Sequence, residues 1–280
     1  MKRRKASGTD EIPIEIIKEM DDEMLTIVLD LMNAWWNEEQ IPNEYLQARV
    51  VLIFKKGDTG RLANYRPISL LCCMYKIFTA ILQKRIEEKK IDPFLQKTQH
   101  GFRRHKSTSQ AIHIIRRILD LGERTDMAVH LILLDWEKAF DKINQDGLFE
   151  AMRRMNIDPK LIRLTREAYR KPMFKTEIDG TESSWHSQTT GIRQGCPLSP
   201  YLFLIVMSVM FKDVHNNTSL QEQLRKHEVL NAGLDEVMYA DDTIIFSHDP
   251  KMLELLLAEI ECEGSKYGMK KLNKNKCEVL

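Results

Sequence analysis

Two short apolar segments, residues 237–239 and 243–246, are separated only by Ala240-Asp241-Asp242. Such runs of apolar and β-branched residues predict strands, and so short a gap predicts a tight hairpin. The hairpin would hold two adjacent carboxylates at the tip of a rigid sheet, where each raises the pKa of the other. An isolated Asp-Asp pair is most simply explained as a solvated acidic turn, because aspartate favours turns.

A third acid changes this interpretation. Residues 129–134 are almost wholly apolar and predict a buried strand that ends at Asp135. If this strand shares a sheet with the hairpin, Asp135, Asp241 and Asp242 converge. Carboxylate oxygens suit Mg²⁺, and two such ions about 4 Å apart can activate a 3′-hydroxyl and stabilise a leaving pyrophosphate. The predicted chemistry is nucleotidyl transfer.

Composition narrows the class of protein. The chain has 280 residues, is 43% hydrophobic and carries a formal charge of +1, so it can bury one large core or two closely packed subdomains. Local basic clusters occur at residues 2–5, 103–106, 116–117 and 270–276. The five cysteines form no C-x-x-C pair, which favours a reducing compartment and buried thiols over structural zinc. No apolar run reaches the ~20 residues of a membrane span, so we expect an intracellular protein, cytoplasmic or nuclear.

Periodicity predicts an α/β chain with these elements. Helices are expected in residues 13–36 (one or a pair), 74–88, after the caps Ser107 to Ser109, 146–155, 158–169, 199–211 and 249–264, with aspartates capping those at 146 and 158; strands are expected at 48–54, 68–71 and 129–134, with hairpins in 174–189 and around 240. The polar stretch 216–228 carries no predicted element.

The chain also resembles a known family. Residues 134–141 (LDWEKAFD), 191–200 (GIRQGCPLSP) and 239–242 (YADD) look like three successive palm motifs of reverse transcriptases, in the same order and spacing. Residues 54–58 (FKKGD), 64–70 (NYRPISL) and 100–103 (HGFR) resemble the fingers motifs of the non-LTR (LINE-type) retrotransposon branch. Residues 5–13 (KASGTDEIP) are similar to the extension that precedes the fingers in that branch. The resemblance covers nearly the whole chain.

This resemblance implies the fingers and palm of a right-hand polymerase, with a small, mainly antiparallel palm sheet flanked by helices. It implies an N-terminal helical extension over residues 1–47 and a reverse transcriptase domain over 48–280. The fingers are expected at about 48–128 and the palm at about 129–280, with part of 145–190 returning toward the fingers. No residues remain for a thumb after the motif near Lys276, nor for an endonuclease ahead of Lys2, so we expect a fragment of a longer retrotransposon polyprotein.

The resemblance also assigns roles to single residues. Asp135 and Asp241 would hold two Mg²⁺ ions, for which Mn²⁺ could substitute, and Asp242 would support them. Phe140 would lie under the incoming sugar and exclude a 2′-hydroxyl; its alternative is a core aromatic on a helix face. The remaining nucleotide contacts would come from Lys55 (or Lys56), Arg66, Gln194 and Gly195.

Three further assignments keep alternatives open. Arg103, Arg104 and Lys106 could contact a template backbone, or simply form a solvated basic surface. Lys276 could donate a proton to the departing pyrophosphate, although an extra lysine at 270 or 271 shifts the motif's register. Glu137 and Asp141 do not match metal ligands of the family motif.

The expected function is an RNA-directed DNA polymerase that extends a DNA 3′ end with deoxynucleotides on an RNA template. One alternative is an inactive or domesticated nucleic-acid-binding remnant of such an enzyme. Another is an RNA-directed RNA polymerase, whose hairpin is usually Gly-Asp-Asp and whose sugar pocket accepts the 2′-hydroxyl.

Overall fold

The computed structural model describes residues 3–89, 91–178, 180–226, 229, 233–269, 272 and 277–280. The chain forms two compact units: a first unit of Met1–Lys89 with Asn156–Ser199, and a second unit of Lys90–Met155 with Pro200–Leu280. The chain therefore leaves the first unit, returns to it at Asn156 and leaves it again after Ser199. The boundaries of the proposed extension, fingers and palm stay a prediction.

The first unit contains a helical layer. Its helices are α1 (Ile14–Lys18), α2 (Asp22–Glu38), α3 (Cys73–Glu88) and α7 (Pro159–Ala168), with short 3-10 turns η1 (Asn43–Leu46) and η2 (Leu62–Asn64). The expected opening helix is thus a pair. The side chain of Asp21 caps α2, and that of Asp158 caps α7 as predicted. Trp35 packs edge-on against Tyr45 and Phe78 in the core of this unit.

A five-stranded sheet accompanies these helices in the first unit. Its strands are β1 (Gln47–Phe54), β2 (Tyr65–Leu71), β4 (Met173–Ile178), β5 (Thr181–Glu182) and β6 (His186–Ser187). β2 pairs antiparallel with β1, and β4 pairs antiparallel with both β5 and β6, which confirms the predicted hairpin region. β1 and β4 pair in parallel, a contact that joins distant parts of the sequence.

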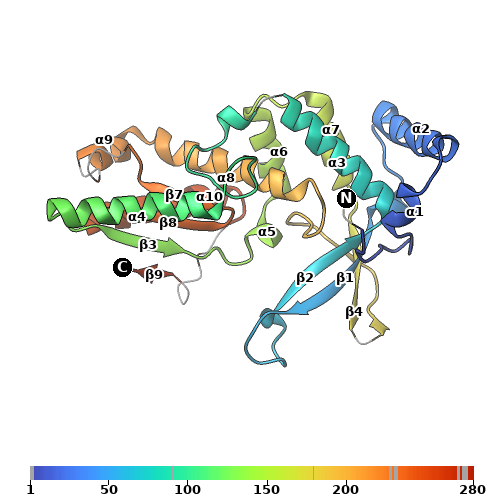
Figure 1. Ribbon diagram of the computed structural model, residues 1–280, viewed down its shortest axis with the longest axis horizontal. Coiled ribbons are helices and arrows are strands. Elements are labelled where there is room, and N and C mark those ends of the chain that lie inside the picture. The colour runs from blue at the N-terminus through green and yellow to red at the C-terminus, as the bar shows by residue number, and fades with distance from the viewer. Residues whose placement is uncertain are drawn as a thin grey trace. The chain divides into compact units, whose positions relative to one another are not determined.

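The second unit is built on a four-stranded sheet in the order β7-β8-β3-β9. These strands are β3 (His130–Leu134), β7 (Glu236–Tyr239), β8 (Asp242–Ser247) and β9 (Glu278–Val279). Every pairing among them is antiparallel, as predicted. Figure 1 shows helix α4 running along this sheet. Its side chains Ala111 and Ile118 pack with Leu131, Val237 and Phe246 in one apolar cluster.

The helices of the second unit follow the predicted pattern with three exceptions: an unpredicted short helix at residues 139–142, an unpredicted helix at residues 218–226, and the capping residue of the helix at residues 145–154. The helices are α4 (Thr108–Thr125), α5 (Ala139–Lys142), α6 (Gln145–Arg154), α8 (Ser199–Asn216), α9 (Thr218–Lys226) and α10 (Pro250–Lys266), with the 3-10 turn η3 (Asp92–Phe94). Helix α9 falls in the polar stretch expected to lack an element. Asn144, not the predicted Asp146, caps α6, because its side-chain oxygen accepts from the Gly147 amide at 2.9 Å.

The apolar helix α8 is buried on all sides over residues 201–211. Among the described residues, no helix combines the length and the apolar character needed to cross a membrane. All five cysteines are free thiols; Cys72, Cys73 and Cys196 are buried as predicted, whereas Cys262 is exposed and Cys277 is partly exposed.

Candidate active site

The three aspartates of the predicted metal site meet at one end of the second unit's sheet. β3 and β8 are antiparallel neighbours, and Leu134 lies opposite Thr243. Continuing this register by one residue places Asp135 opposite Asp242. Asp135 follows a largely buried strand, because Leu131, Ile132 and Leu134 are buried and successive side chains of a strand point to opposite faces.

The third acid, Asp241, lies in the turn of the β7–β8 hairpin. Tyr239 pairs with Asp242, which leaves Ala240 and Asp241 as the two turn residues. Ala240 has a φ of 60°, the left-handed geometry that two-residue hairpin turns require at their first position. The predicted tight hairpin with carboxylates at its tip is therefore confirmed.

The electrostatics of this site favour a cation. Partial burial, followed by the negative charges of Asp241 and Asp135, raises the pKa of Asp242. The three carboxylates thus act on one another through space, and a divalent ion would relieve their repulsion. Glu137 lies nearby in the sequence, but it pairs with Lys142 at 2.7 Å, in keeping with its exclusion from the site.

The donor set fits hard divalent ions. Carboxylate oxygens are the ligands that Mg²⁺ takes, and Mg²⁺ completes its shell with water and substrate phosphates. Asp135 follows the end of β3, Asp241 lies in the turn, and Asp242 begins β8. Two such ions about 4 Å apart are a known arrangement in enzymes that transfer nucleotides.

Phe140 lies five residues after Asp135, in the short helix α5. Its ring stacks on Phe203 of α8, with centroids 4.5 Å apart and planes inclined by 6°. The ring of Phe102 meets it edge-on at 6.3 Å. Phe203 is fully buried, while Phe140 keeps part of its surface accessible. One face of the Phe140 ring is therefore fixed by the core.

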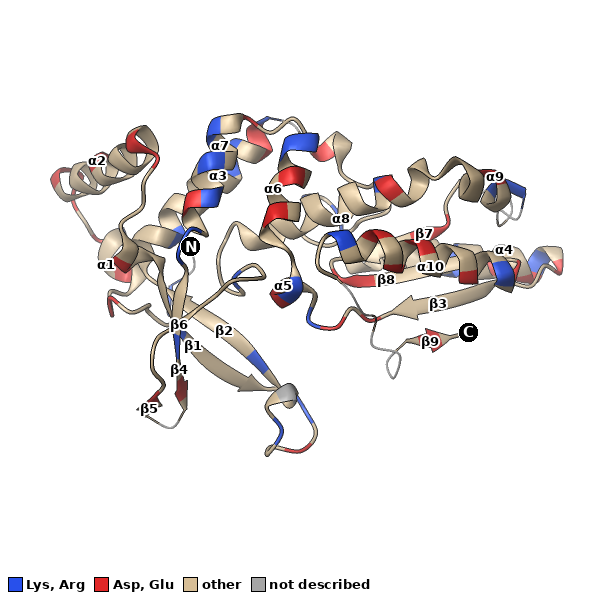
Figure 2. Ribbon diagram, turned by 180° about the vertical axis from the view of Figure 1, so that it is seen from behind, with Lys and Arg blue, Asp and Glu red and all other residues tan. Residues whose placement is uncertain are grey.

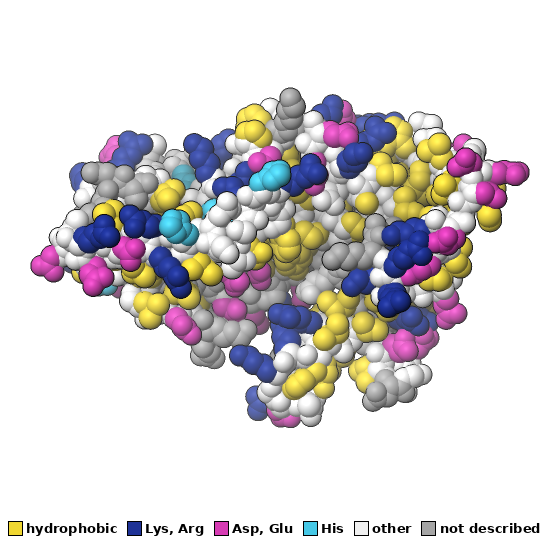
Figure 3. Space-filling view, viewed as in Figure 1, with side chains coloured by type: hydrophobic (Ala, Val, Ile, Leu, Met, Phe, Trp, Pro, Cys, Tyr) yellow, Lys and Arg dark blue, Asp and Glu magenta, His cyan; other side chains and the backbone are white. Residues whose placement is uncertain are grey.

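The predicted nucleotide contacts other than Phe140 all lie in the first unit. Lys55 follows β1, and its backbone amide donates to Asn64 at 2.8 Å, which closes the β1–β2 hairpin. Arg66 lies opposite Ile53 on β2 and is exposed. Figure 2 shows Lys and Arg on the loop between β1 and β2, and Figure 3 shows their side chains gathered at this hairpin.

Gln194 and Gly195 lie on a loop that packs against β2. The Ser69 amide donates to the Gln194 carbonyl at 2.7 Å. A Cβ on Gly195 would lie 2.4 Å from the Ser69 carbonyl oxygen, and its φ is +123°. Only glycine fits this approach. The structure thus places Gln194 and Gly195 against β2, the strand that carries Arg66.

Arg193 is a residue that the sequence did not single out. Its side chain is 2% exposed, its guanidinium donates to the Leu46 carbonyl, and it lies 5.3 Å from the Tyr75 ring centroid. It anchors the loop that carries Gln194. A charged residue inside an otherwise loop-like motif was the only available signal.

The candidate template residues separate in the structure. The Arg103 guanidinium binds Asp92 through two nitrogens and also donates to the Gln96 and Gln99 carbonyls, so it serves as an internal brace. Arg104 is exposed and Lys106 is partly exposed. Lys276, the predicted proton donor, lies outside the described residues.

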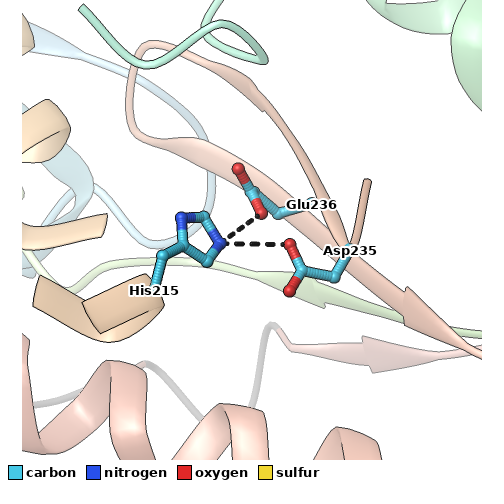
Figure 4. Close-up of side chains that lie close together, drawn as sticks. All are labelled: His215, Asp235 and Glu236. Carbon is cyan, nitrogen blue, oxygen red and sulfur yellow. Dashed lines mark hydrogen bonds and ion pairs between the residues drawn. The ribbon is translucent and has the colours of Figure 1, made fainter. Parts of the chain in front are cut away.

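A second ionisable cluster lies elsewhere in the second unit. His215 of α8 directs its Nε2 atom to Asp235 and Glu236, each at 3.2 Å (Figure 4). Within the described part of the chain, this is the only group of three His, Cys, Asp or Glu side chains whose potential metal-binding atoms all lie within 4.8 Å of one another. Burial alone lowers the pKa of His215, but its hydrogen bonds to the two carboxylates outweigh burial and raise it to about 10.

We assign this cluster a structural role. The 3.2 Å contacts and the raised pKa fit an imidazolium held by two carboxylates, which leaves no lone pair on Nε2 for a metal. Glu236 is buried, and its other oxygen accepts from Gln96 and Thr98 at 2.7 Å each. The cluster therefore links α8 and residues 96–98 to the start of β7.

Comparison with known families shows which family this chain belongs to. A family model described as "Reverse transcriptase (RNA-dependent DNA polymerase)" matches residues 53–280. The chain belongs to the reverse transcriptase family. Reverse transcriptases generally use divalent metal ions, in agreement with the donor set of this domain.

Curated relatives place this reverse transcriptase domain among those of non-LTR retrotransposons. It is 25% identical over 278 residues to the "Retrovirus-related Pol polyprotein from type-1 retrotransposable element R2" of Nasonia vitripennis, covering 99% of this chain and 26% of that protein. It is 28% identical over 253 residues to the "RNA-directed DNA polymerase from mobile element jockey" of Drosophila melanogaster, covering 89% of this chain and 26% of that protein. The domain thus spans about a quarter of each of these longer relatives.

Solved structures show the same fold. The reverse transcriptase domain matches apo telomerase from Candida tropicalis, truncated from its C-terminal domain, with a TM-score of 0.61 and 15% identity over 90% of this chain and 55% of that one. Telomerase from Candida albicans, solved with a TWJ fragment of telomeric RNA, matches with a TM-score of 0.56 and 14% identity over 90% of this chain and 45% of that one. At these identities the likeness concerns the fold alone. It confirms the expected fingers-and-palm class.

Proposed function

We propose that this chain is the catalytic core of an RNA-directed DNA polymerase that extends a DNA 3′ end with deoxynucleotides on an RNA template. The observation that carries the proposal is the meeting of Asp135, Asp242 and Asp241 where β3 ends beside the β7–β8 turn. The family membership of the chain supports the same reaction.

In this proposal Asp135 and Asp241 hold two Mg²⁺ ions, or Mn²⁺ in their place, and Asp242 adds negative charge beside them. When bound, such ions activate the primer 3′-hydroxyl and stabilise the leaving pyrophosphate. The chain's own contribution is geometric, because a sheet end and a tight turn hold the carboxylates in fixed directions.

Phe140 selects deoxynucleotides over ribonucleotides in the proposed reaction. The core fixes one face of its ring through Phe203, so the ring cannot easily move aside. A rigid ring under the sugar would clash with a 2′-hydroxyl and reject ribonucleotides.

Lys55 and Arg66 bind the triphosphate, and Gln194 with Gly195 supports the nascent base pair. Cationic side chains at such positions neutralise charge that develops on the phosphates. The hydrogen bond between Ser69 and Gln194 supports this assignment, since it joins the loop to the strand that carries Arg66. Arg104 and Lys106 are left as the template contacts, and Lys276 stays a candidate proton donor.

The partners of the domain are an RNA template, a DNA primer, dNTPs and the remainder of a longer polyprotein. This part of the proposal rests on relatives that are about four times as long as the matched segment. Contacts between basic side chains and the phosphates of the template depend strongly on salt concentration.

Primer extension tests the proposal. The chain is mixed with a DNA primer on an RNA template, Mg²⁺ or Mn²⁺, and either dNTPs or NTPs, at low salt and with enzyme in excess over primer. We expect template-directed addition of dNTPs, little addition of NTPs, and no addition in EDTA. If the chain binds the primer-template but does not extend it with either Mg²⁺ or Mn²⁺, the proposed polymerase function is wrong. A nucleic-acid-binding remnant is then favoured.

A further inference from the structure

The catalytic hairpin is held by a segment that the proposed chemistry does not use. Residues 98–100 run beside β7: the Met238 amide donates to the Thr98 carbonyl at 3.0 Å, and the His100 amide donates to the Met238 carbonyl at 2.8 Å. Gln99 and Met238 form a parallel bridge. This segment therefore adds a short extra strand to the edge of the sheet, next to the turn that carries Asp241.

The side chain of Gln99 continues this pairing into the turn itself. Its Oε1 accepts from the Ala240 amide at 2.8 Å, and its Nε2 donates to the Ala240 carbonyl at 3.0 Å. Oε1 also accepts from the Gly101 amide at 2.8 Å. The carboxamide thus pairs with both backbone polar groups of Ala240 as a neighbouring peptide would. Gln99 is fully buried, so water does not compete for these bonds.

Ala240 needs such support because of its backbone conformation. Its φ of 60° is unfavourable by about 1 kcal/mol for a residue with a Cβ atom. Gly101 packs closely against the same residue, and a Cβ there would lie 2.2 Å from the Ala240 nitrogen. The turn is therefore enclosed by Gln99 and Gly101 on the side away from solvent.

We propose that Gln99 is a positioning residue of the polymerase site: its carboxamide fixes the turn at Ala240 and thereby the direction in which Asp241 and Asp242 project toward their metal ions. The catalytic part of this inference rests on the proposed function. The hydrogen bonds by which Gln99 holds Ala240, here called the clamp, do not depend on the proposed function.

The same segment offers a matched control. Gln96 donates to Glu236 at 2.7 Å, so it ties residues 96–98 to the opposite end of β7, away from the turn. If Gln99 merely helped to hold the segment on the sheet, loss of either glutamine would have the same effects. If Gln99 positions the turn, only its loss changes the site.

The experiment compares Gln99→Met, Gln99→Glu and Gln96→Met in the 280-residue chain. Methionine keeps the length of the side chain and removes all three hydrogen bonds. Glutamate keeps the two acceptor contacts, but it loses the donor to the Ala240 carbonyl and should impair the site partly; it also serves if the methionine variant does not fold.

The first measurement is hydrogen exchange of the Ala240 amide in metal-free protein. We expect Gln99→Met to exchange at least about tenfold faster than wild type, and Gln96→Met to exchange like wild type. The second is calorimetric titration with Mg²⁺, in which we expect at least about fivefold weaker binding for Gln99→Met only. In primer extension, kcat should fall more than the KM for dNTP rises.

Unchanged Ala240 exchange and Mg²⁺ affinity in Gln99→Met, or equal changes in Gln96→Met, would overturn the positioning role. If wild type does not polymerise, the proposed function fails. Hydrogen exchange of the Ala240 amide and the affinity for Mg²⁺ then still test whether Gln99 holds the turn at Ala240. If wild type polymerises and Gln99→Met matches it in kcat, the clamp has no catalytic consequence and the inference fails.

Discussion

Phe140 stacks on Phe203 with ring centroids 4.5 Å apart and planes inclined by 6°. Because Phe203 is fully buried, this contact fixes the ring proposed to select the sugar. Replacement of Phe140 by alanine should raise ribonucleotide incorporation relative to deoxynucleotides by about tenfold or more, as expected when a steric barrier of 1–3 kcal/mol is removed. Competing dNTP and NTP in primer extension measures the ratio.

Phe149→Leu is a suitable control, because Phe149 is a buried aromatic of α6 in the same unit. It should lower stability without a change in sugar discrimination. If Phe140→Ala leaves discrimination unchanged, Phe140 is a core residue only.

Gly195→Ala should weaken nucleotide binding. The new Cβ would lie 2.4 Å from the Ser69 carbonyl oxygen, at a φ of +123°, so the loop must move away from β2. We expect a loss of about 2 kcal/mol of stability and a KM for dNTP raised about tenfold. Chemical unfolding and steady-state primer extension give the two values.

Gly180 provides the matched control for backbone strain. Its φ is +77°, but nothing lies within 4 Å of an added Cβ. Gly180→Ala should cost about 1 kcal/mol and leave the KM for dNTP unchanged. A similar rise in KM for both variants would show that strain, and not the contact with Ser69, is responsible.

Arg154 should stabilise the second unit through a network that joins α6, α8 and the end of α10. Its guanidinium donates to Asp213 at 2.7 Å and to the Tyr267 hydroxyl at 2.8 Å, and that hydroxyl donates to Asp213 at 2.9 Å. Arg154→Ala leaves Asp213 without its cation and should lower the free energy of unfolding by about 2 kcal/mol. Tyr267→Phe should lower it by about 1 kcal/mol.

The neighbouring Arg153 serves as the control. It pairs with Glu150 on the exposed side of α6, and such pairs contribute little. Denaturant titration should show no measurable change for Arg153→Ala. Equal destabilisation by both arginine variants would contradict the role assigned to the Arg154 network.

The His215 cluster predicts a pH dependence of stability. Its carboxylate partners raise the pKa of His215 from 6.5 to about 10 in the folded chain. The resulting stabilisation is complete below pH 6.5 and is lost as the pH rises through 10. Burial also raises the pKa of the Glu236 carboxyl in the folded chain. The free energy of unfolding therefore falls further as rising pH removes the proton from Glu236.

The decline in unfolding free energy between about pH 7 and pH 10 should therefore be on the order of 2 kcal/mol smaller in His215→Asn than in wild type. The exposed His113 of α4 gives the control variant His113→Asn. Urea titrations at a series of pH values supply the comparison. If the unfolding free energies of wild type and His215→Asn change in parallel with pH, His215 is not an imidazolium stabilised by its two carboxylate partners.

Local patterns made much of the fold predictable. Ser107 caps α4 through a capping box with Gln110, and both residues precede a regular apolar stripe. Helix α9 was missed because its composition is polar and only Leu220 and Leu224 are buried. The parallel pairing of β1 with β4 was also missed, because it depends on contacts between segments more than a hundred residues apart.

The acids of the site were predictable for a physical reason. Asp135 and Asp241 follow short apolar strands, where a carboxylate needs an explanation. Gln99 gave no such signal, because its significance depends on Ala240, 141 residues further along the chain. The His215 cluster was missed for the same reason: His215 belongs to α8, and Asp235 and Glu236 lie at the start of β7, two segments that meet only in the folded unit.

Single-turnover addition of one dNTP to a DNA primer on an RNA template, in Mg²⁺, tests whether Asp135 and Asp241 form the polymerase site. Wild type is compared with Asp135→Asn, Asp241→Asn and Asp120→Asn; Asp120 is an exposed acid of α4 that pairs with Arg117 at 3.6 Å. We expect a loss of at least about 100-fold in rate for Asp135→Asn and Asp241→Asn and none for Asp120→Asn. Wild-type rates in Asp135→Asn or Asp241→Asn would contradict this assignment of the site.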